Sequence, residues 1–252
     1  MPKWFFLGSA YAVADNLHEN THMVVQGRER IMMIDCVNNP IIRLEHVGLN
    51  HHNLTDLVLT HFHPDHVSGV PLLLMNMWLL GRKHLLNIYG LHHTMDRIEN
   101  LMAAYDWSHW PNFFPVAFHR LPKEEMTLAV DSEDFRVFTS PVKHLLPTIG
   151  LRVELREIGK SVAYSCDTEP CPQIIHLARD VDFLIHEAAG EGPGHSSATQ
   201  AAMTACQAGA KRLYLVHYPV GGFDTRPLVD EAREVFQGEV VLVEDYMEIP
   251  FN

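Results

Sequence analysis

Residues 55–69 read TDLVLTHFHPDHVSG, a hydrophobic run that ends in a cluster of potential metal ligands. The run has the apolar and β-branched composition of a strand, and His61, His63, Asp65 and His66 follow it. A strand end fixes the backbone, while the turn after it lets alternate side chains face different metal ions. Helical HExxH spacing would instead give a single zinc ion two ligands one turn apart. The stretch therefore predicts a metal site with enough ligands for two ions.

Three further candidate ligands each stand at the end of a separate strand-like run. They are His144 in SPVKH, Asp167 in VAYSCDT and His217 in LYLVHY. Loops that follow strands are where scaffolds present catalytic groups. The recurrence of this placement predicts that the three residues converge on the site that begins at His61.

Composition favours one globular domain over residues 1–252 that acts on small substrates. Hydrophobic residues make up 47% of the chain, which is enough for a buried core. The net charge is −12 and no dense Lys/Arg run occurs, so long RNA is disfavoured as a partner because nucleic-acid binding needs basic side chains. No apolar run is long enough to cross a membrane, and four cysteines without a CxxC pair fit a reducing cytoplasm.

Strands dominate both halves of the chain, and helices follow them. Strand-like runs are predicted at 4–10, 21–27, 30–36, 56–61, 86–90, 135–141, 150–157, 161–167, 182–188, 213–218 and 238–246. Helices are predicted at 70–80, 92–107, after Cys171, at 196–210 and at 226–236. This order favours an α/β fold in which two β-sheets lie between helical layers.

In its motifs the sequence resembles the metallo-β-lactamase superfamily, and within it the branch of ribonuclease Z and related phosphodiesterases. The resemblance covers nearly the whole chain. FFLGSAYAV, RIMMIDC ending at Asp35, HFHPDH, SPVKH, AYSCDTEP, DFLIHEA, GHSSATQAA and LYLVHY follow in the family's order. It implies the metallo-β-lactamase fold, a four-layer αββα sandwich, and a metal-dependent hydrolase.

The resemblance also implies a ligand map for two zinc ions, with manganese or iron as alternatives. His61, His63 and His144 would bind the first ion; Asp65, His66 and His217 would bind the second; Asp167 would bridge both. A hydroxide that bridges the two metals would be the nucleophile, with Asp65 positioning it.

Glu187 in HEAAG and His195 in GHSS are the features specific to this branch. By similarity His195 is the acid that protonates the leaving oxygen, or an oxyanion stabiliser, and Glu187 orients it. The structural alternatives are a histidine that caps a loop and a glutamate in an ordinary salt bridge.

The sequence departs from ribonuclease Z in two places. Those enzymes carry a long arm for transfer RNA between the positions that match His144 and Asp167, where this chain has only a short predicted hairpin. Val37 follows Asp35 and Cys36 where the family commonly has glycine. These departures favour a small or modest phosphodiester as substrate. The resemblance allows a homodimer, but no residue locates an interface.

Several residues near the motifs are given structural interpretations. Cys166 is expected to point away from Asp167 by strand alternation and is rejected as a ligand. His22 and His186 are expected to be core or supporting histidines. The aromatic stretch 105–114 is left between two readings, core packing and an exposed surface that lines a pocket or meets a partner.

Other functions stay open on the same scaffold. A lactone, thioester or sulfate-ester hydrolase would use the same metals with a different pocket and would not need His195 as an acid. An iron-loaded redox enzyme or a binding protein that keeps the metal cage is the third class.

Overall fold

Two β-sheets form the centre of the computed structural model, which describes residues 1–251. The six-stranded sheet has the order β1-β2-β3-β4-β5-β6, and the seven-stranded sheet has the order β13-β12-β11-β10-β9-β8-β7. The first sheet contains β1 (Lys3–Gly8), β2 (His22–Gln26), β3 (Ile31–Ile34), β4 (Leu54–Val58), β5 (Leu86–Leu91) and β6 (Val116–Leu121). The second contains β7 (Thr127–Asp131), β8 (Phe135–Val142), β9 (Thr148–Leu155), β10 (Lys160–Tyr164), β11 (Phe183–Glu187), β12 (Arg212–Val216) and β13 (Glu239–Leu242).

Each sheet is half antiparallel and half parallel. In the first, β1, β2 and β3 pair antiparallel, whereas β3 to β6 pair parallel. In the second, β7 to β10 pair antiparallel, and β10 to β13 pair parallel. The carboxyl ends of parallel neighbours meet at one edge of a sheet. The loops after β10, β11 and β12 of the second sheet can therefore bring their side chains together.

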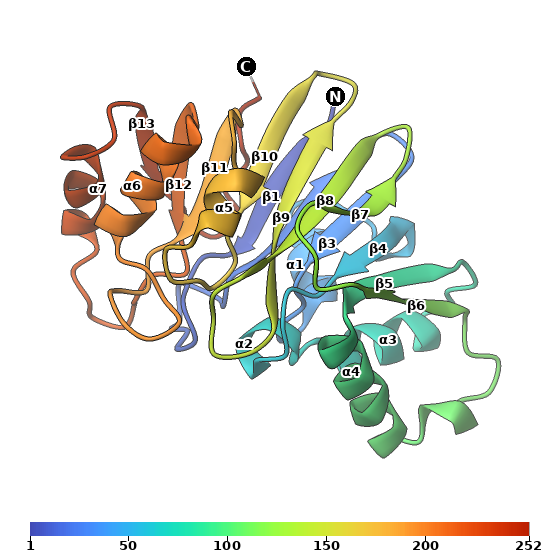
Figure 1. The fold of residues 1–252 in the computed structure, drawn as a ribbon. Helices are drawn as coiled ribbons and strands as arrows, with labels where there is room; N and C mark the ends of the chain where they lie inside the picture. Colours follow the sequence, from blue (N-terminus) through green and yellow to red (C-terminus); the bar gives the residue numbers. More distant parts are fainter. Residues whose placement is uncertain (252) are drawn as a thin grey trace.

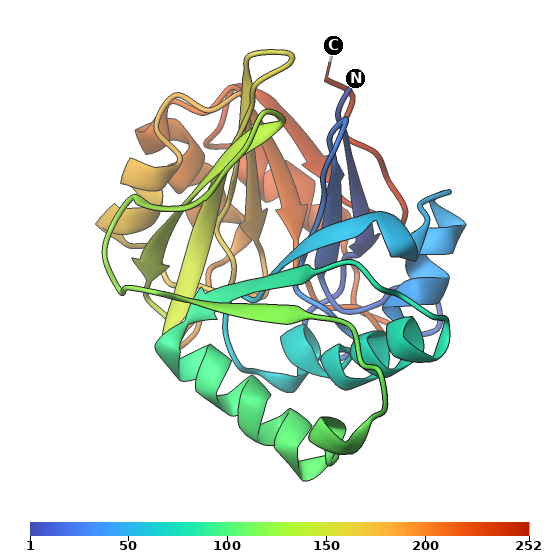
Figure 2. The same cartoon turned by 90° about the vertical axis from the view of Figure 1, so that its right-hand side faces the viewer.

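Helices cover the outer face of each sheet (Figures 1 and 2). The first sheet is covered by α1 (Pro40–His46), α2 (Pro64–Val67), α3 (Val70–Leu79) and α4 (His92–Ala104), together with the short 3-10 helices η1 (His51–Asn53) and η2 (Trp107–His109). The second is covered by α5 (Pro172–Leu177), α6 (Ala198–Ala208) and α7 (Arg226–Arg233). The four layers confirm the predicted αββα sandwich. Within the described residues, no helix has the length and apolarity needed to cross a bilayer.

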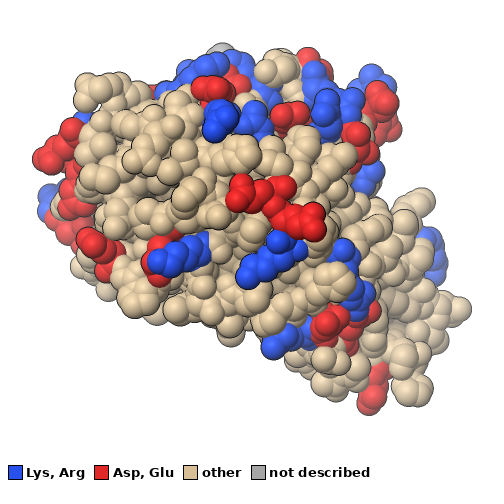
Figure 3. Space-filling model, in the orientation of Figure 1, with Lys and Arg blue, Asp and Glu red and all other residues tan. Residues whose placement is uncertain are grey.

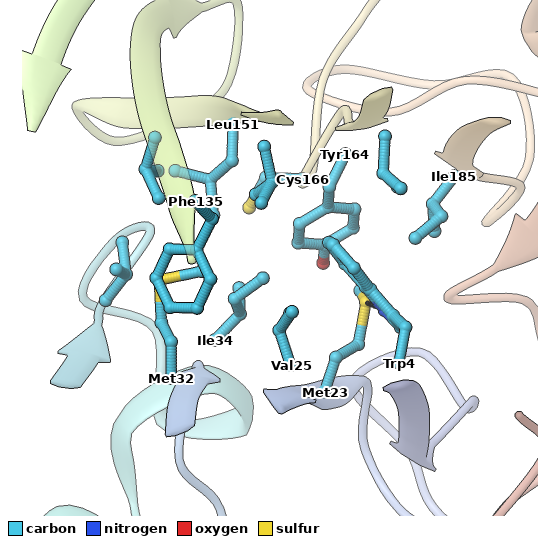
Figure 4. Packing of buried hydrophobic residues seen from close by; sticks show 14 of the residues in the cluster. Trp4, Met23, Val25, Met32, Ile34, Phe135, Leu151, Tyr164, Cys166 and Ile185 are labelled. Atoms are coloured by element: carbon cyan, nitrogen blue, oxygen red, sulfur yellow. Dashed lines mark hydrogen bonds between the residues drawn. The ribbon is translucent and has the colours of Figure 1, made fainter. Parts of the chain in front are cut away.

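The alternation of side chains along β1 shows how the layers are held together. Trp4 and Phe6 pack between the two sheets, whereas Phe5 and Leu7 pack against the helices. Both faces of this strand are buried, so its sequence is a continuous apolar run rather than an alternating one. Figure 4 shows the core between the sheets, where Trp4 and neighbouring side chains of the first sheet face Tyr164 and its neighbours from the second.

Helix α1 and strands β6 and β7 were not predicted. Asn39 precedes α1, Pro40 starts it, and Ile41 and Leu44 are buried against the core, so a start signal was present in a stretch interpreted as polar loop. Strands β6 and β7 lie at the edges of their sheets and are largely half-buried or exposed. Only Leu121 of β6 and Val130 of β7 are fully buried, so neither strand has a clear apolar run or alternation. Helix α7 also ends at Arg233, before the predicted end at 236.

The aromatic stretch 105–114 mainly extends the outer core. The rings of Trp110 and Trp78 stack with their centroids 4.9 Å apart, and Trp78 Nε1 donates to the carbonyl of Pro111 at 2.8 Å. Phe114 is buried, whereas Tyr105 is 55% exposed. Aromatic pairing of this kind stabilises a loop against a helix. Core packing describes Trp107, Trp110, Phe113 and Phe114, whereas Tyr105 and the polar residues of the stretch are exposed.

Candidate metal centre

The first group of candidate ligands consists of His61, His63, His144 and Asp167, whose ligand atoms all lie within 4.8 Å of one another. His63 Nδ1 lies 2.9 Å from His61 Nε2 and 3.2 Å from His144 Nε2. Asp167 Oδ2 lies 3.9 Å from both His61 Nε2 and His144 Nε2. Three imidazole nitrogens and a carboxylate oxygen facing one point form a donor set suited to a divalent cation.

The second group consists of Asp65, His66, Asp167 and His217. His66 Nε2 lies 3.4 Å from Asp65 Oδ2, and His217 Nε2 lies 3.5 Å from the same oxygen. Asp167 Oδ2 is 3.4 Å from both of these nitrogens. The structure therefore brings together all seven residues that the sequence nominated as ligands, and Asp167 belongs to both groups.

Four of these residues lie on loops that follow strands, whereas Asp65 and His66 lie in α2. His61 comes after β4, His144 after β8, Asp167 after β10 and His217 immediately after β12. In Figure 1 the loops gather at the lower edge of the sandwich beside α2. His217 has a φ of 51°, a left-handed conformation that non-glycine residues adopt mainly at constrained sites. The turn aims its side chain back toward Asp167.

A buried carboxylate beneath the second group orients one ligand. Asp35 Oδ2 accepts from His66 Nδ1 at 2.8 Å, and Asp35 Oδ1 accepts from the amide and hydroxyl of Thr60 at 2.8 and 2.9 Å. A proton held on Nδ1 leaves Nε2 of His66 free to face the cluster. His144 has the equivalent support, because its Nδ1 donates to the carbonyl of Gly194 at 2.7 Å.

Several buried polar atoms of the cluster have no hydrogen-bond partner within residues 1–251 and are placed to bind a metal ion. Among the described residues, His66 Nε2, His217 Nε2 and Asp167 Oδ1 are buried without a hydrogen-bond partner. Buried polar atoms in native proteins nearly always have partners. Divalent cations bound between the nitrogens and carboxylates would satisfy these atoms.

Protonation of the histidines also suits metal binding. Burial lowers the pKa of His61, His63 and His144, so these imidazoles stay neutral. Burial also opposes charge on His66, but the carboxylates of Asp167 and Asp35 outweigh it and raise its pKa. A cation bound at Nε2 of His66 would take the place of that proton, because metal ligands must be deprotonated.

His195 and Glu187 form a pair beside both groups. His195 Nδ1 donates to Glu187 Oε1 at 3.0 Å, and the fully buried Glu187 carboxylate also accepts from the amides of Thr168 and Ala189 at 2.8 and 3.1 Å. The His195 ring centroid lies 5.0 Å from that of His144. The hydrogen bond that His195 donates to Glu187 raises the pKa of His195. The pair therefore places a proton-carrying imidazole at the rim of the cluster.

Strand alternation does not apply to Cys166. Strand β10 ends at Tyr164, and Cys166 has a φ of 53°, so strand alternation does not reach it. Its Sγ lies 3.5 Å from His61 Nδ1, on the opposite ring nitrogen to the one that faces His63 and Asp167. Burial raises the pKa of this thiol well above its usual range, which keeps it protonated. Cys166 thus lies outside both groups that contain Asp167.

The supporting residues were only partly visible in the sequence. His22 and His186 are buried, as expected of structural histidines. Their Nδ1 atoms donate to the carbonyls of Asn20 and Glu187 at 2.8 and 2.9 Å. Asp35 ended a recognised strand but was not nominated, and Gly194 was missed. The position of Gly194 directly before His195 was the available signal.

The fold and this His/Asp cluster define a metal-dependent hydrolase of the metallo-β-lactamase fold. The metallo-β-lactamase fold protein YhfI from Bacillus subtilis superposes with a TM-score of 0.84 at 20% identity and covers 98% of each chain. Human short-form tRNase Z superposes with a TM-score of 0.79 at 25% identity and covers 100% of each chain. The ribonuclease Z of Porphyromonas gingivalis is 26% identical, covering 92% of this chain and 93% of its own.

The family model described as "Anti-Pycsar protein Apyc1" matches residues 2–236, and the chain belongs to this family.

Proposed function

We propose that this protein is a dinuclear zinc phosphodiesterase that acts on a small or modest phosphodiester. One observation carries the proposal: Asp167 Oδ2 lies 3.4 to 3.9 Å from the Nε2 atoms of His61, His66, His144 and His217. A carboxylate placed between two histidine sets is the ligand that two neighbouring ions would share. His61, His63 and His144 would hold one ion, and Asp65, His66 and His217 the other.

Zinc suits this donor set because imidazole and carboxylate ligands are typical of zinc sites, although manganese and iron accept the same atoms. When bound, two ions would supply an activated water and positive charge against the phosphate oxygens. Asp65 would orient that water and accept its proton. Burial opposes the charge of Asp65, but the nearby imidazoles of His217 and His66 outweigh it and lower its pKa, so it stays a carboxylate.

His195 would deliver a proton to the leaving oxygen. Its Nδ1 is held by Glu187, which fixes the ring and keeps a proton on the imidazole. General acid catalysis of this kind contributes roughly 10² to 10⁴ in rate, and most for a leaving group that is a poor anion. Glu187 acts through His195 and does not itself need to touch the substrate.

The proposed substrate is small because the surface and the loops do not favour a long polyanion. The described residues between His144 and Asp167 form only β9 and β10 with their connections. The net charge is −12, and acidic and basic side chains are interspersed on the face shown in Figure 3. The relatives named ribonuclease Z support a phosphodiester as the bond that is cleaved.

The test measures turnover of bis(p-nitrophenyl) phosphate, a 3′,5′-cyclic mononucleotide, a transfer-RNA precursor and an aryl lactone by protein of known metal content. We expect turnover of the two small phosphodiesters, little of the precursor, and a loss in His195→Ala that is larger for the cyclic nucleotide. Lactone turnover alone, with no effect of His195→Ala, would instead establish the rival hydrolase. Metal analysis by mass spectrometry decides between zinc and iron or manganese.

A further inference from the structure

The backbone of Gly194 joins a candidate metal ligand to the loop that carries His195. Its carbonyl accepts from His144 Nδ1 at 2.7 Å, and its amide donates to Glu169 Oε1 at 3.0 Å. Gly194 has a φ of 82°, and a Cβ at this position would lie 2.8 Å from His144 Nδ1. The backbone therefore lies directly against the imidazole, one residue before His195.

Glu169 is itself held in place from a second loop. Its Oε2 lies 2.5 Å from Lys143 Nζ, and its amide donates to the Lys143 carbonyl at 2.8 Å. The amide of Lys143 donates in turn to Thr168 Oγ1 at 3.1 Å. Three loops, those of His144, Asp167 and His195, are thus joined by one short ladder of hydrogen bonds that ends at the Gly194 amide.

The loop from Ala188 to His195 is anchored at its start, where the Ala188 amide donates to the Val216 carbonyl at 2.9 Å and the Ala189 amide donates to Glu187 Oε2 at 3.1 Å. The rest of the loop contains three glycines, and its other backbone hydrogen bonds run from the Gly190 amide to the Ser196 carbonyl and from the His195 amide to the Gly192 carbonyl, both at 3.1 Å. Glycine-rich backbone has the most conformations to lose on ordering. The His195 ring is held at Nδ1 by Glu187, so its placement depends on the backbone being held as well.

We infer that Glu169 is a positioning residue for His195, because it holds the Gly194 amide, one residue before His195, and so keeps His195 beside the centre. The inference rests on the acid role proposed for His195. Misplacement of a catalytic group by about 1 Å costs roughly 10²-fold in rate. Loss of the Glu169 acceptor lowers the rate for substrates whose leaving group needs a proton from His195, and it changes the rate for other substrates little.

Amide hydrogen exchange tests the tether without any need for turnover. In Glu169→Ala, the peptide covering residues 189–197 should exchange faster than in the wild type, while Glu169→Gln, which keeps an acceptor, should exchange at close to the wild-type rate. Glu191→Ala is the matched control. Glu191 borders the same cavity of about 380 Å³ as Glu169 and His195 but makes no hydrogen bond or ion pair to a described residue.

Kinetics then separates positioning from a general structural effect. With a 3′,5′-cyclic nucleotide, whose leaving group is an alkoxide, we expect Glu169→Ala to lower kcat by about 10- to 100-fold. With a p-nitrophenolate leaving group, which needs little protonation, we expect a loss of less than about threefold. Glu169→Gln should restore most of the rate, and zinc content should match the wild type. The double variant Glu169→Ala/His195→Ala should be no slower than His195→Ala alone.

The outcomes distinguish this inference from the proposed function. If His195→Ala has no effect on the cyclic nucleotide, the acid role proposed for His195 fails. If His195→Ala is impaired but Glu169→Ala exchanges and turns over like the wild type, only the role of Glu169 fails. Additive losses in the double variant also overturn it, because Glu169 would then act elsewhere. Glu169→Met, of similar length without an oxygen acceptor, replaces the alanine variant if that one does not fold.

Discussion

Replacing Asp35 by asparagine exchanges one buried carboxylate oxygen beneath the metal cluster for an NH₂ group. Asp35 is fully buried, and its two oxygens accept from His66 Nδ1 and from the amide and hydroxyl of Thr60. If the NH₂ group faces His66, it forces the imidazole proton onto Nε2, the atom that faces Asp167. If it faces Thr60 instead, the NH₂ group and the Thr60 amide are two buried donors that oppose each other.

Either arrangement weakens metal binding by an amount that follows from the contacts. Loss of a supporting partner to a ligating histidine typically lowers metal affinity by about 10- to 100-fold, which is about 1.4 to 2.8 kcal/mol. An opposed or unpaired buried donor also lowers the free energy of unfolding of the metal-free protein by roughly 1 to 3 kcal/mol. The two effects are separable because the first appears only when zinc is present.

The assay is competition for zinc between the protein and a chromogenic chelator at fixed pH, with thermal unfolding of the metal-free protein beside it. Asp182→Asn is the matched control, because Asp182 accepts from the Ser161 amide and pairs with Lys160 and Lys211, all outside the metal groups. We expect its zinc affinity to equal that of the wild type. A folded Asp35→Asn protein with wild-type zinc affinity would refute the reasoning.

Three further predictions follow from other parts of the structure. His63→Ala should lose metal and turnover together, whereas His195→Ala should keep its metal and lose turnover of alkoxide substrates; full metal occupancy in His63→Ala, measured by mass spectrometry, contradicts the ligand map. Burial opposes the charge of Asp182, but the hydrogen bond from Lys211 and others outweigh it and lower its pKa. The stability it contributes is therefore present above the ordinary aspartate pKa of about 3.9 and is lost as pH falls through the lower folded value; urea unfolding of Asp182→Asn should show a deficit at neutral pH that shrinks on acidification, and a constant deficit contradicts this. Trp4→Ala should lower the free energy of unfolding by about 3 to 5 kcal/mol, because Trp4 is fully buried between the sheets; a loss below about 1 kcal/mol in denaturant titration would show that the core is not packed there as described.

The sequence was most informative where a ligand follows a buried strand. His61, Asp167 and His217 each end an apolar run. Parallel pairing within the second sheet brings the ends of β10 and β12 to one edge, and the end of β4 in the first sheet meets that edge from the other side of the sandwich. The continuous apolar run of β1 and the capping box at Ser197, which starts α6, are local signals of the same strength. These features depend on neighbouring residues alone, so the sequence contains them directly.

Other features depend on contacts that no local pattern encodes. Strands β6 and β7 have only one fully buried residue each, so their sequences lack a strong apolar pattern, and pairing with a neighbouring strand defines them. Cys166 has a left-handed backbone beyond the end of β10, so the alternation on which its predicted orientation rested does not extend to it. The link from His144 to Gly194 joins residues 50 positions apart. Only the folded chain shows that the metal ligand His144 is hydrogen-bonded to the backbone of the loop that carries His195.

The proposal that Asp167 lies between two metal ions is tested most directly by anomalous X-ray diffraction at the zinc absorption edge, from a crystal of the zinc-loaded protein. We expect two anomalous peaks on either side of the Asp167 carboxylate, about 3.5 to 4 Å apart, one against His61, His63 and His144 and the other against Asp65, His66 and His217. A single peak, or peaks away from Asp167, would contradict the dinuclear site.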